Sequence, residues 1–287
     1  MTSHTDSQAF NPGVALRILA IVRLIGILLI TLFVAIPLAI LRFVLSPWPN
    51  AKRAVRLFYF KLWSRWVCAL LGARSNVFGE LPAAQCMVAS NHLGYLDILV
   101  IAQYAPAVFV SKADVLQWPV VGWLTKLADT LYIARERHRD IPRANQSIAA
   151  ALQAGDNVVL FPEGTSSNSD WILPVRPPLL QVAASEQFPV STIALYYQTD
   201  TPDPHAHQAI CYFGDMSFGS HVWRLLHLRG FKVDIRFSGA LLQDTERKTL
   251  ALKVRKSILD LQTENEPDSP KPNLDESYAF QKFQSHG

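Results

Sequence analysis

Cysteine is scarce in this chain of 287 residues. The three cysteines, Cys68, Cys86 and Cys211, are scattered and odd in number, which argues against a disulfide framework and against a metal-binding cysteine cluster. We interpret them as buried thiols of a protein from a reduced compartment. His205 and His207 lie in a loop-like segment without a third ligand nearby in the sequence, so no metal site is predicted.

Several other features are missing, and each absence excludes a class of function. There is no zinc-finger spacing and no basic helix followed by heptads, so the chain lacks a nucleic-acid-binding signature. There is no G-x-S-x-G sequence, which argues against a serine acyl-enzyme. Charged residues make up 17% of the chain while half of it is hydrophobic, and the net charge is +4. That balance suits an anionic lipid surface.

An apolar segment lies near the N-terminus. The 18 residues 24–41 carry no charge and are flanked by Arg17, Arg23 and Arg42. A run of 18 residues is the lower limit for a transmembrane helix. The run is long for the hydrophobic h-region of a signal peptide, and no A-x-A site follows it. A second stretch, 51–74, mixes cations with Trp and Tyr, as is typical of the headgroup zone.

Three interpretations of this N-terminal module remain open. It is a spanning helix, a hairpin that dips into one leaflet, or a buried hairpin of a soluble protein. Positive charge on both sides of the apolar run favours the leaflet hairpin.

The hydrophobic pattern changes at about residue 75 to short apolar runs that alternate with helical stretches. This alternation predicts an α/β domain with a mixed sheet flanked by helices, preceded by the membrane-associated helical module. We expect a flexible N-terminus at 1–12, a hairpin at 13–74, the α/β domain at 75–262 and a disordered tail at 263–287. The predicted strands are 86–90, 108–110, 131–133, 158–161, 190–197 and 231–237, and the predicted helices are 96–104, 140–154, 220–228 (stopped by Gly230) and 245–262.

A histidine and an aspartate interrupt one apolar stretch. His92 and Asp97 are five positions apart, which requires a turn between a strand and a helix, and Gly94 supplies a flexible position in it. Imidazole removes a hydroxyl proton near neutral pH, and a carboxylate on its other nitrogen orients the ring. The alternative is a core histidine and an unrelated aspartate in the first turn of a helix.

A second block follows about seventy residues later, directly after the predicted strand 158–161. It reads Phe-Pro-Glu-Gly-Thr over residues 161–165. A glycine after a strand, with hydroxyl side chains beside it, can present N–H donors to an anion, and Glu163 can bind an acceptor hydroxyl. The alternative for the block alone is an ordinary turn after a strand.

The two blocks in this order resemble the glycerolipid acyltransferase superfamily, specifically the bacterial 1-acylglycerol-3-phosphate acyltransferases. Residues 91–97, 130–135, 161–165 and 189–193 are similar to its four blocks. The resemblance implies His92 as general base, Asp97 as its orienting partner and Arg135 as a ligand of the acceptor phosphate. It also implies substrate contacts from Asn91, Lys112, Glu163, Gly164 and Thr165.

Three positions depart from this pattern. Ser166 stands where an arginine is usual, which removes a charge-assisted contact of about 1.5–3 kcal/mol. Asp129 replaces a common glycine and Thr192 a proline. The third block, continued by residues 172–174, also resembles the lyso-ornithine lipid acyltransferases, so the acceptor stays open.

The resemblance implies an O-acyltransferase that moves a fatty acyl group from coenzyme A or acyl carrier protein to a lysolipid, without a cofactor. Lysophosphatidate is the first expected acceptor, giving phosphatidate, and lyso-ornithine lipid is the alternative. The expected location is the inner membrane, with the active site facing the cytoplasm. A membrane adaptor without activity and a thioester hydrolase are the competing hypotheses.

Overall fold

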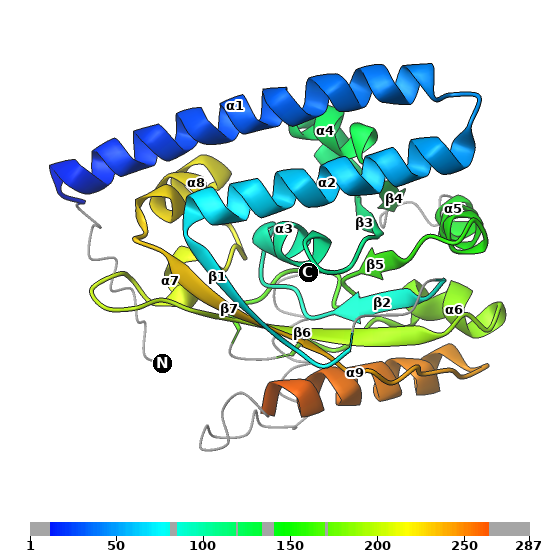
Figure 1. The fold of residues 1–287 in the computed structure, drawn as a ribbon. Helices are drawn as coiled ribbons and strands as arrows, with labels where there is room; N and C mark the ends of the chain where they lie inside the picture. The colour runs from blue at the N-terminus through cyan, green and yellow to red at the C-terminus, as the bar shows by residue number, and fades with distance from the viewer. Residues whose placement is uncertain (1–11, 81–84, 119, 134–140, 170–171, 264–287) are drawn as a thin grey trace.

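The computed structural model describes residues 12–80, 85–118, 120–133, 141–169 and 172–263 (Figure 1). Seven strands form one sheet in the order β1-β7-β6-β2-β5-β3-β4. All neighbouring strands are parallel except β6 and β7, so the predicted mixed sheet is confirmed. The strands are β1 Ala73–Phe78, β2 Met87–Ser90, β3 Val108–Lys112, β4 Leu131–Ile133, β5 Val158–Leu160, β6 Val190–Gln198 and β7 Phe231–Phe237.

Helices cover both faces of the sheet (Figure 1). Successive strand residues point to opposite faces, so Val88 packs with α2, α3 and α8, whereas Met87 and Ala89 pack with α5, α6 and α9. The result is a layered α/β/α domain with one hydrophobic core on each side of the sheet. The helices are α1 Val14–Val44, α2 Pro49–Leu71, α3 Leu96–Ala102, α4 Val121–Leu127, α5 Ile141–Gln153, α6 Gln181–Ser185, α7 Ala206–Ala209, α8 Phe218–His227 and α9 Arg247–Thr263, with 3₁₀ turns at Ala113–Gln117 and Pro177–Leu180.

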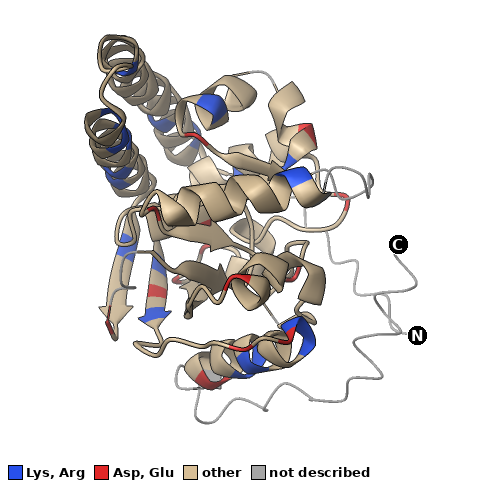
Figure 2. Ribbon diagram, turned by 90° about the vertical axis from the view of Figure 1, so that its right-hand side faces the viewer, with Lys and Arg blue, Asp and Glu red and all other residues tan. Residues whose placement is uncertain are grey.

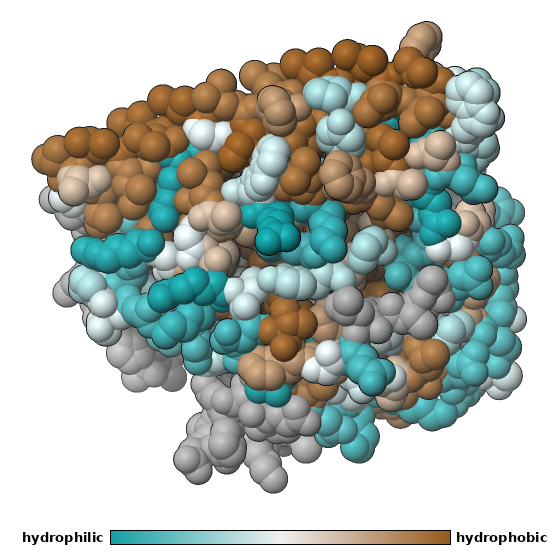
Figure 3. Space-filling model, viewed as in Figure 1, coloured by the Kyte–Doolittle hydropathy of each residue, from teal (hydrophilic) through white to brown (hydrophobic). Residues whose placement is uncertain are grey.

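The two N-terminal helices form an antiparallel hairpin that lies along the domain, outside α3 and α8 (Figure 1). By length and composition α1 could cross a membrane, and 22% of its most apolar window is buried. Its outer side forms a continuous hydrophobic surface (Figure 3). The large exposed apolar side chains of α1 are Val14, Ile18, Ile21, Val22, Leu24, Ile25, Leu28, Leu29, Leu32, Phe33, Ile36, Ile40, Phe43 and Val44.

Both halves of α1 are tied to the domain by arginines. Arg23 is buried and donates from Nη1 to the carbonyl oxygens of Leu226, at 3.1 Å, and of Leu228, at the C-terminal end of α8. Arg42 forms a bidentate pair with Asp129, with N–O distances of 2.8 and 2.6 Å. The two arginines are about 28 Å apart along a straight helix, so α1 is fixed over most of its length.

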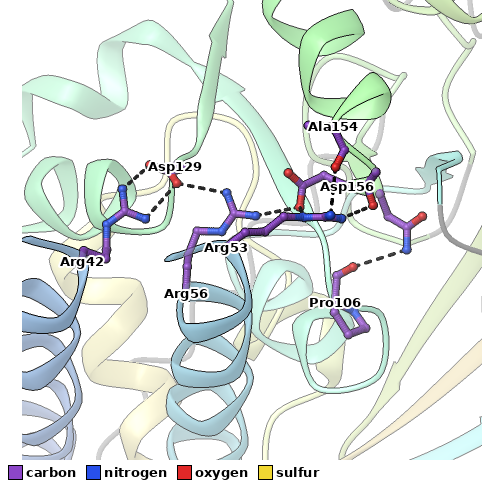
Figure 4. Close-up of polar contacts among 9 residues, drawn as sticks. Arg42, Arg53, Arg56, Pro106, Asp129, Ala154 and Asp156 are labelled. Carbon is purple, nitrogen blue, oxygen red and sulfur yellow. Dashed lines mark hydrogen bonds and ion pairs between the residues drawn. The ribbon is translucent and has the colours of Figure 1, made fainter. Parts of the chain in front are cut away.

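A chain of ion pairs continues from Arg42 into α2 (Figure 4). Arg56 bridges Asp129 at 3.1 Å and Asp156 at 2.7 Å, and Arg53 contacts Asp156 at 2.7 Å. Asp129 precedes β4 and Asp156 precedes β5, so this cluster lies where the two strands begin. Figure 2 shows basic residues along the hairpin and also on α9, on the other side of the sheet.

The structure corrects several sequence predictions. Helix α2 ends at Leu71, where Gly72 adopts φ +78°, and β1 starts at Ala73 inside the segment predicted to be helical. Gly230 is not the stop of α8, whose cap is Leu228. Its missing Cβ instead allows close approach to β1, because a Cβ there would lie 2.8 Å from the Gly72 oxygen.

Helices α4, α6 and α7 and strand β1 were not predicted, because each is short or lacks a clear period. The predicted domain limits stay predictions, and most of the segments 1–12 and 263–287 lies outside the described residues.

Candidate active site

Most of the predicted site residues come from one edge of the sheet. Strands β2, β5, β3 and β4 are parallel, so their carboxyl ends meet at the edge where open α/β sheets bind ligands. His92 follows β2, Lys112 ends β3 and Glu163 follows β5. Arg135 belongs to the segment after β4 and lies outside the described residues. Lys112 is exposed, and its role stays a prediction.

His92 and Asp97 are in direct contact. Residues 91–95 form the turn after β2, and Leu96 starts α3, which places Asp97 in the first helical turn. Nδ1 of His92 lies 2.8 Å from Oδ2 of Asp97. The carboxylate is completely buried, whereas the imidazole side chain is 22% exposed. Because the carboxylate accepts, Nδ1 donates and Nε2 carries the lone pair that a general base needs.

The turn itself holds the carboxylate. The backbone N–H groups of Leu93 and Gly94 donate to the same Asp97 oxygen at 2.6 and 2.9 Å. The turn is also bound to the chain after α7, because Tyr212 N donates to Leu93 O at 2.8 Å. A Cβ at position 94 would lie 3.0 Å from Tyr212 N, so glycine permits this close approach.

The two sequence blocks meet at His92. Its ring stacks on Phe161, with centroids 4.0 Å apart and an interplanar angle of 17°. The backbone of the two loops is also joined, since Ser167 N donates to His92 O at 2.8 Å. The first and third blocks therefore form one continuous structure around the imidazole.

Glu163 is turned into the protein interior. It is fully buried, and its two carboxyl oxygens accept from the backbone N–H groups of His92, at 3.3 Å, and of Leu173, at 3.4 Å. Burial raises the pKa of Glu163 well above its usual range. In this structure the carboxyl group braces the two loops, and its predicted contact with an acceptor hydroxyl stays a prediction.

Asn91 is also turned inward. Its side chain is 1% exposed and its amide exchanges two hydrogen bonds with the backbone of Leu195 on β6, at 2.8 and 3.0 Å. These contacts replace ladder hydrogen bonds where β2 ends, so Asn91 fixes the start of the turn formed by residues 91–95. Its predicted substrate contact stays a prediction.

The remaining residues of the third block shape a tight turn. Gly164 is buried with φ +82°, a conformation that favours glycine, and its N–H donates to Phe161 O at 3.1 Å. Thr165 is half-buried, and its substrate contact stays a prediction. Ser166 directs its hydroxyl to Tyr212 O at 2.5 Å. Position 166 therefore adds no positive charge to this side of the site.

Two tyrosines near the dyad, the buried Tyr197 and the half-buried Tyr95, were not selected from the sequence. Tyr197 donates to Oδ1 of Asp97 at 3.0 Å. Tyr95 donates to Nδ1 of His221 at 2.9 Å, while Nε2 of His221 donates to Cys211 O at 3.1 Å. Burial lowers the pKa of His221 to about 4, so the ring is neutral at pH 7. The period-two alternation of β6 was the available signal for Tyr197, since it places this hydroxyl on the same buried face as Ile193 and Leu195.

Comparisons with known proteins place the chain in a family. A family model described as "Acyltransferase" matches residues 75–196. A lyso-ornithine lipid O-acyltransferase from Rhizobium meliloti is 32% identical over 215 residues, which are 69% of this chain and 74% of that protein. The chain belongs to the acyltransferase family. It is an O-acyltransferase.

Further relatives of this acyltransferase carry two kinds of name. A lyso-ornithine lipid O-acyltransferase from Pseudomonas aeruginosa is 32% identical, covering 68% of this chain and 75% of that protein. A 1-acyl-sn-glycerol-3-phosphate acyltransferase from Neisseria gonorrhoeae is 30% identical, covering 60% and 67%. The crystal structure of the LPA acyltransferase PlsC from Thermotoga maritima shares the fold, with a TM-score of 0.62 and 18% identity over 86% of this chain and 98% of that one.

Proposed function

We propose that this enzyme transfers a fatty acyl group from an acyl thioester to the free hydroxyl of a lysolipid at a membrane surface. The observation that carries the proposal is the His92–Asp97 pair, in which a buried carboxylate binds Nδ1 and leaves Nε2 as the base of a partly exposed ring. The names of the relatives support a lysolipid as the acceptor class.

The proposed reaction is a direct transfer in a ternary complex. Nε2 of His92 takes the proton of the acceptor hydroxyl as its oxygen attacks the thioester carbonyl. The new C–O bond forms, the C–S bond breaks, and the leaving thiolate of coenzyme A or acyl carrier protein receives the proton from His92. Asp97 stabilises the imidazolium in between, and general-base help of this kind contributes about 10²–10⁴-fold. No metal or redox cofactor takes part in this scheme.

For the acceptor we propose lyso-ornithine lipid. Ser166 stands where the glycerol-phosphate enzymes usually have an arginine, and its hydroxyl donates to Tyr212 O. The two relatives with 32% identity carry this activity in their names. Lysophosphatidate is the second candidate, because Lys112 ends β3 at the same edge of the sheet as His92 and is a cation that suits a phosphate. Arg135, the other predicted phosphate ligand, lies outside the described residues.

For the membrane module we propose a hairpin that lies in one leaflet. The apolar outer side of α1 faces away from the domain (Figure 3), while Arg23 and Arg42 hold the helix along the domain surface. A helix bound to the domain in this way is suited to enter a bilayer sideways, next to a site that takes a one-tailed lipid and returns a two-tailed one. We place the active site on the cytoplasmic side of the inner membrane, where acyl thioesters are made.

The test is an acyl-transfer assay on detergent-purified protein. Long-chain acyl-CoA is supplied with lyso-ornithine lipid or with lysophosphatidate, and products are quantified by mass spectrometry for the wild type, for His92→Ala and for His205→Ala, a control at an exposed histidine in a loop. We expect ornithine lipid as the main product, a loss of about 10²-fold or more in His92→Ala and none in His205→Ala.

Three results would contradict parts of the proposal. Phosphatidate as the main product would show that the cations hold phosphate without an arginine at 166. Near wild-type turnover by His92→Ala would remove the mechanism. Thioester loss without any lysolipid would identify a hydrolase.

A further inference from the structure

The two oxygens of the Asp97 carboxylate have different partners. Oδ2 accepts from His92 Nδ1 and from the N–H groups of Leu93 and Gly94. Oδ1 accepts from the Tyr197 hydroxyl at 3.0 Å, and the described residues provide no second donor to it. Asp97 is completely buried and Tyr197 is 3% exposed, so water has little access to the contact. Rotation of the carboxylate would break this hydrogen bond as well as the one to His92.

Tyr197 is held rigidly by the sheet. It lies on β6 and pairs with Val233 of β7, while the first part of β6, Val190–Ile193, is bonded to β2. Leu195 lies two residues earlier on the same face, and its backbone N–H and carbonyl groups hydrogen-bond to the Asn91 side chain at the start of the turn that carries His92. The ring packs edge-on against Phe231, with centroids 5.9 Å apart and an interplanar angle of 66°. Position 197 is therefore placed relative to Asp97 by strand pairing and by packing.

Other titratable groups face this pair from the surrounding elements. They are His92 on the same turn, Glu163 after β5, Cys68 on α2 and Cys211 after α7. Burial, with Asp97 nearby, raises the pKa of the Tyr197 hydroxyl well above its usual range. The hydroxyl therefore stays protonated across the working pH range and always serves as the donor to the carboxylate.

We propose that Tyr197 is a positioning residue for the acyl transfer. Its hydroxyl holds Asp97 so that Oδ2 remains on His92 Nδ1 and Nε2 stays the base. This role rests on the proposed function of His92. It differs from a packing role, because the ring alone would fill the same space without restraining the carboxylate.

Tyr197→Phe keeps the ring and removes only the hydroxyl. We expect kcat to fall about tenfold, since one hydrogen bond to a charged group is lost, while the KM for the acceptor stays within about twofold. The carboxylate loses a donor and becomes more basic, so the acid limb of the kcat/KM against pH profile moves to higher pH. The matched control is Tyr104→Phe, a half-buried tyrosine with no side-chain hydrogen bond in the described structure, for which no change is expected.

A second readout does not depend on turnover. In ¹⁵N-histidine NMR of the whole protein in detergent micelles, the His92 signal is assigned by its absence in His92→Ala and then titrated. Tyr197→Phe should raise the pH midpoint of this signal, and Tyr104→Phe should leave it unchanged.

The outcomes separate this inference from the proposed function. An inactive His92→Ala together with wild-type kcat, pH profile and NMR titration in Tyr197→Phe would overturn the role of Tyr197 alone. So would a loss of activity that only follows a lower melting temperature, with both pH curves unmoved. An active His92→Ala would instead overturn the proposed function.

Discussion

Arg56→Met tests whether the ion-pair cluster fastens the membrane hairpin to the catalytic domain. The Arg56 side chain is 5% exposed and contacts Asp129 at 3.1 Å and Asp156 at 2.7 Å. Methionine keeps an apolar stem of similar length and removes the charge. The variant therefore separates the electrostatic contribution from the packing of α2 against the sheet.

The expected loss of stability depends on the arginine partners that Asp129 and Asp156 retain in the variant. Removing one partner of a buried pair costs about 3–5 kcal/mol when the other charge is left alone. Here Asp156 keeps Arg53 at 2.7 Å and Asp129 keeps Arg42 at 2.6 Å. Nε of Arg56 is also buried without a hydrogen-bond partner, which lowers the net value of the wild-type arrangement. We expect a loss of about 2 kcal/mol, or about 4–8 °C in melting temperature.

The assay is thermal unfolding in mild detergent by intrinsic fluorescence, with Arg65→Met as the control. Arg65 lies on the same helix and is exposed, so its replacement should change stability by less than about 0.5 kcal/mol.

A second expectation concerns the dependence of stability on pH. Burial works to raise the pKa of Asp129, but the hydrogen bonds and charges of Arg42 and Arg56 outweigh it and lower the pKa.

A lowered carboxyl pKa gives a definite sign. The stability from Asp129 is complete above 3.8, its ordinary value, and is lost as the pH falls through the folded-state pKa. Below pH 4, the stability of Arg56→Met should therefore fall less steeply with decreasing pH than that of the wild type. The reasoning is refuted if Arg56→Met is no less stable than Arg65→Met, since the hairpin would then be held by apolar packing alone.

Two further predictions concern buried titratable groups beside the active site. Burial raises the pKa of Glu163, so the wild type loses stability as the pH rises above 4.5, the ordinary pKa of this group. Glu163→Gln should reduce this dependence of stability on pH and should have a higher melting temperature than the wild type at pH 7. An unchanged pH dependence in thermal melts from pH 5 to 8 would contradict the assignment. Burial lowers the pKa of His221 to about 4, so stability falls as the pH drops from 6.5 toward 4. The midpoints of urea unfolding at pH 7 and pH 5 should differ less in His221→Gln than in the wild type. Equal differences would show that His221 is not the group responsible.

The sequence determined the features that depend on local spacing. The turn between His92 and Asp97 follows from a strand, a glycine and a helix start within six residues, and the structure brings the two side chains together as the spacing predicted. Strands β4 and β7 have the predicted limits, because alternating or continuous apolar runs between turn residues specify them. The apolar N-terminal run likewise predicted a long helix, because its hydrophobicity does not depend on any partner.

The tertiary structure alone decided which groups face the substrate edge and which face the core. Asn91 and Glu163 belong to the recognised blocks, yet strand pairing turns both inward, where they bind backbone of Leu195, His92 and Leu173. Tyr197 reaches Asp97 across a hundred residues of sequence, and Arg56 bridges two aspartates that lie 73 and 100 residues away. Such contacts are set by the order of strands in the sheet and by the docking of the hairpin. Neither leaves a local signal, because hydrogen bonds and ion pairs between distant segments depend on where the chain brings them and not on their spacing along it.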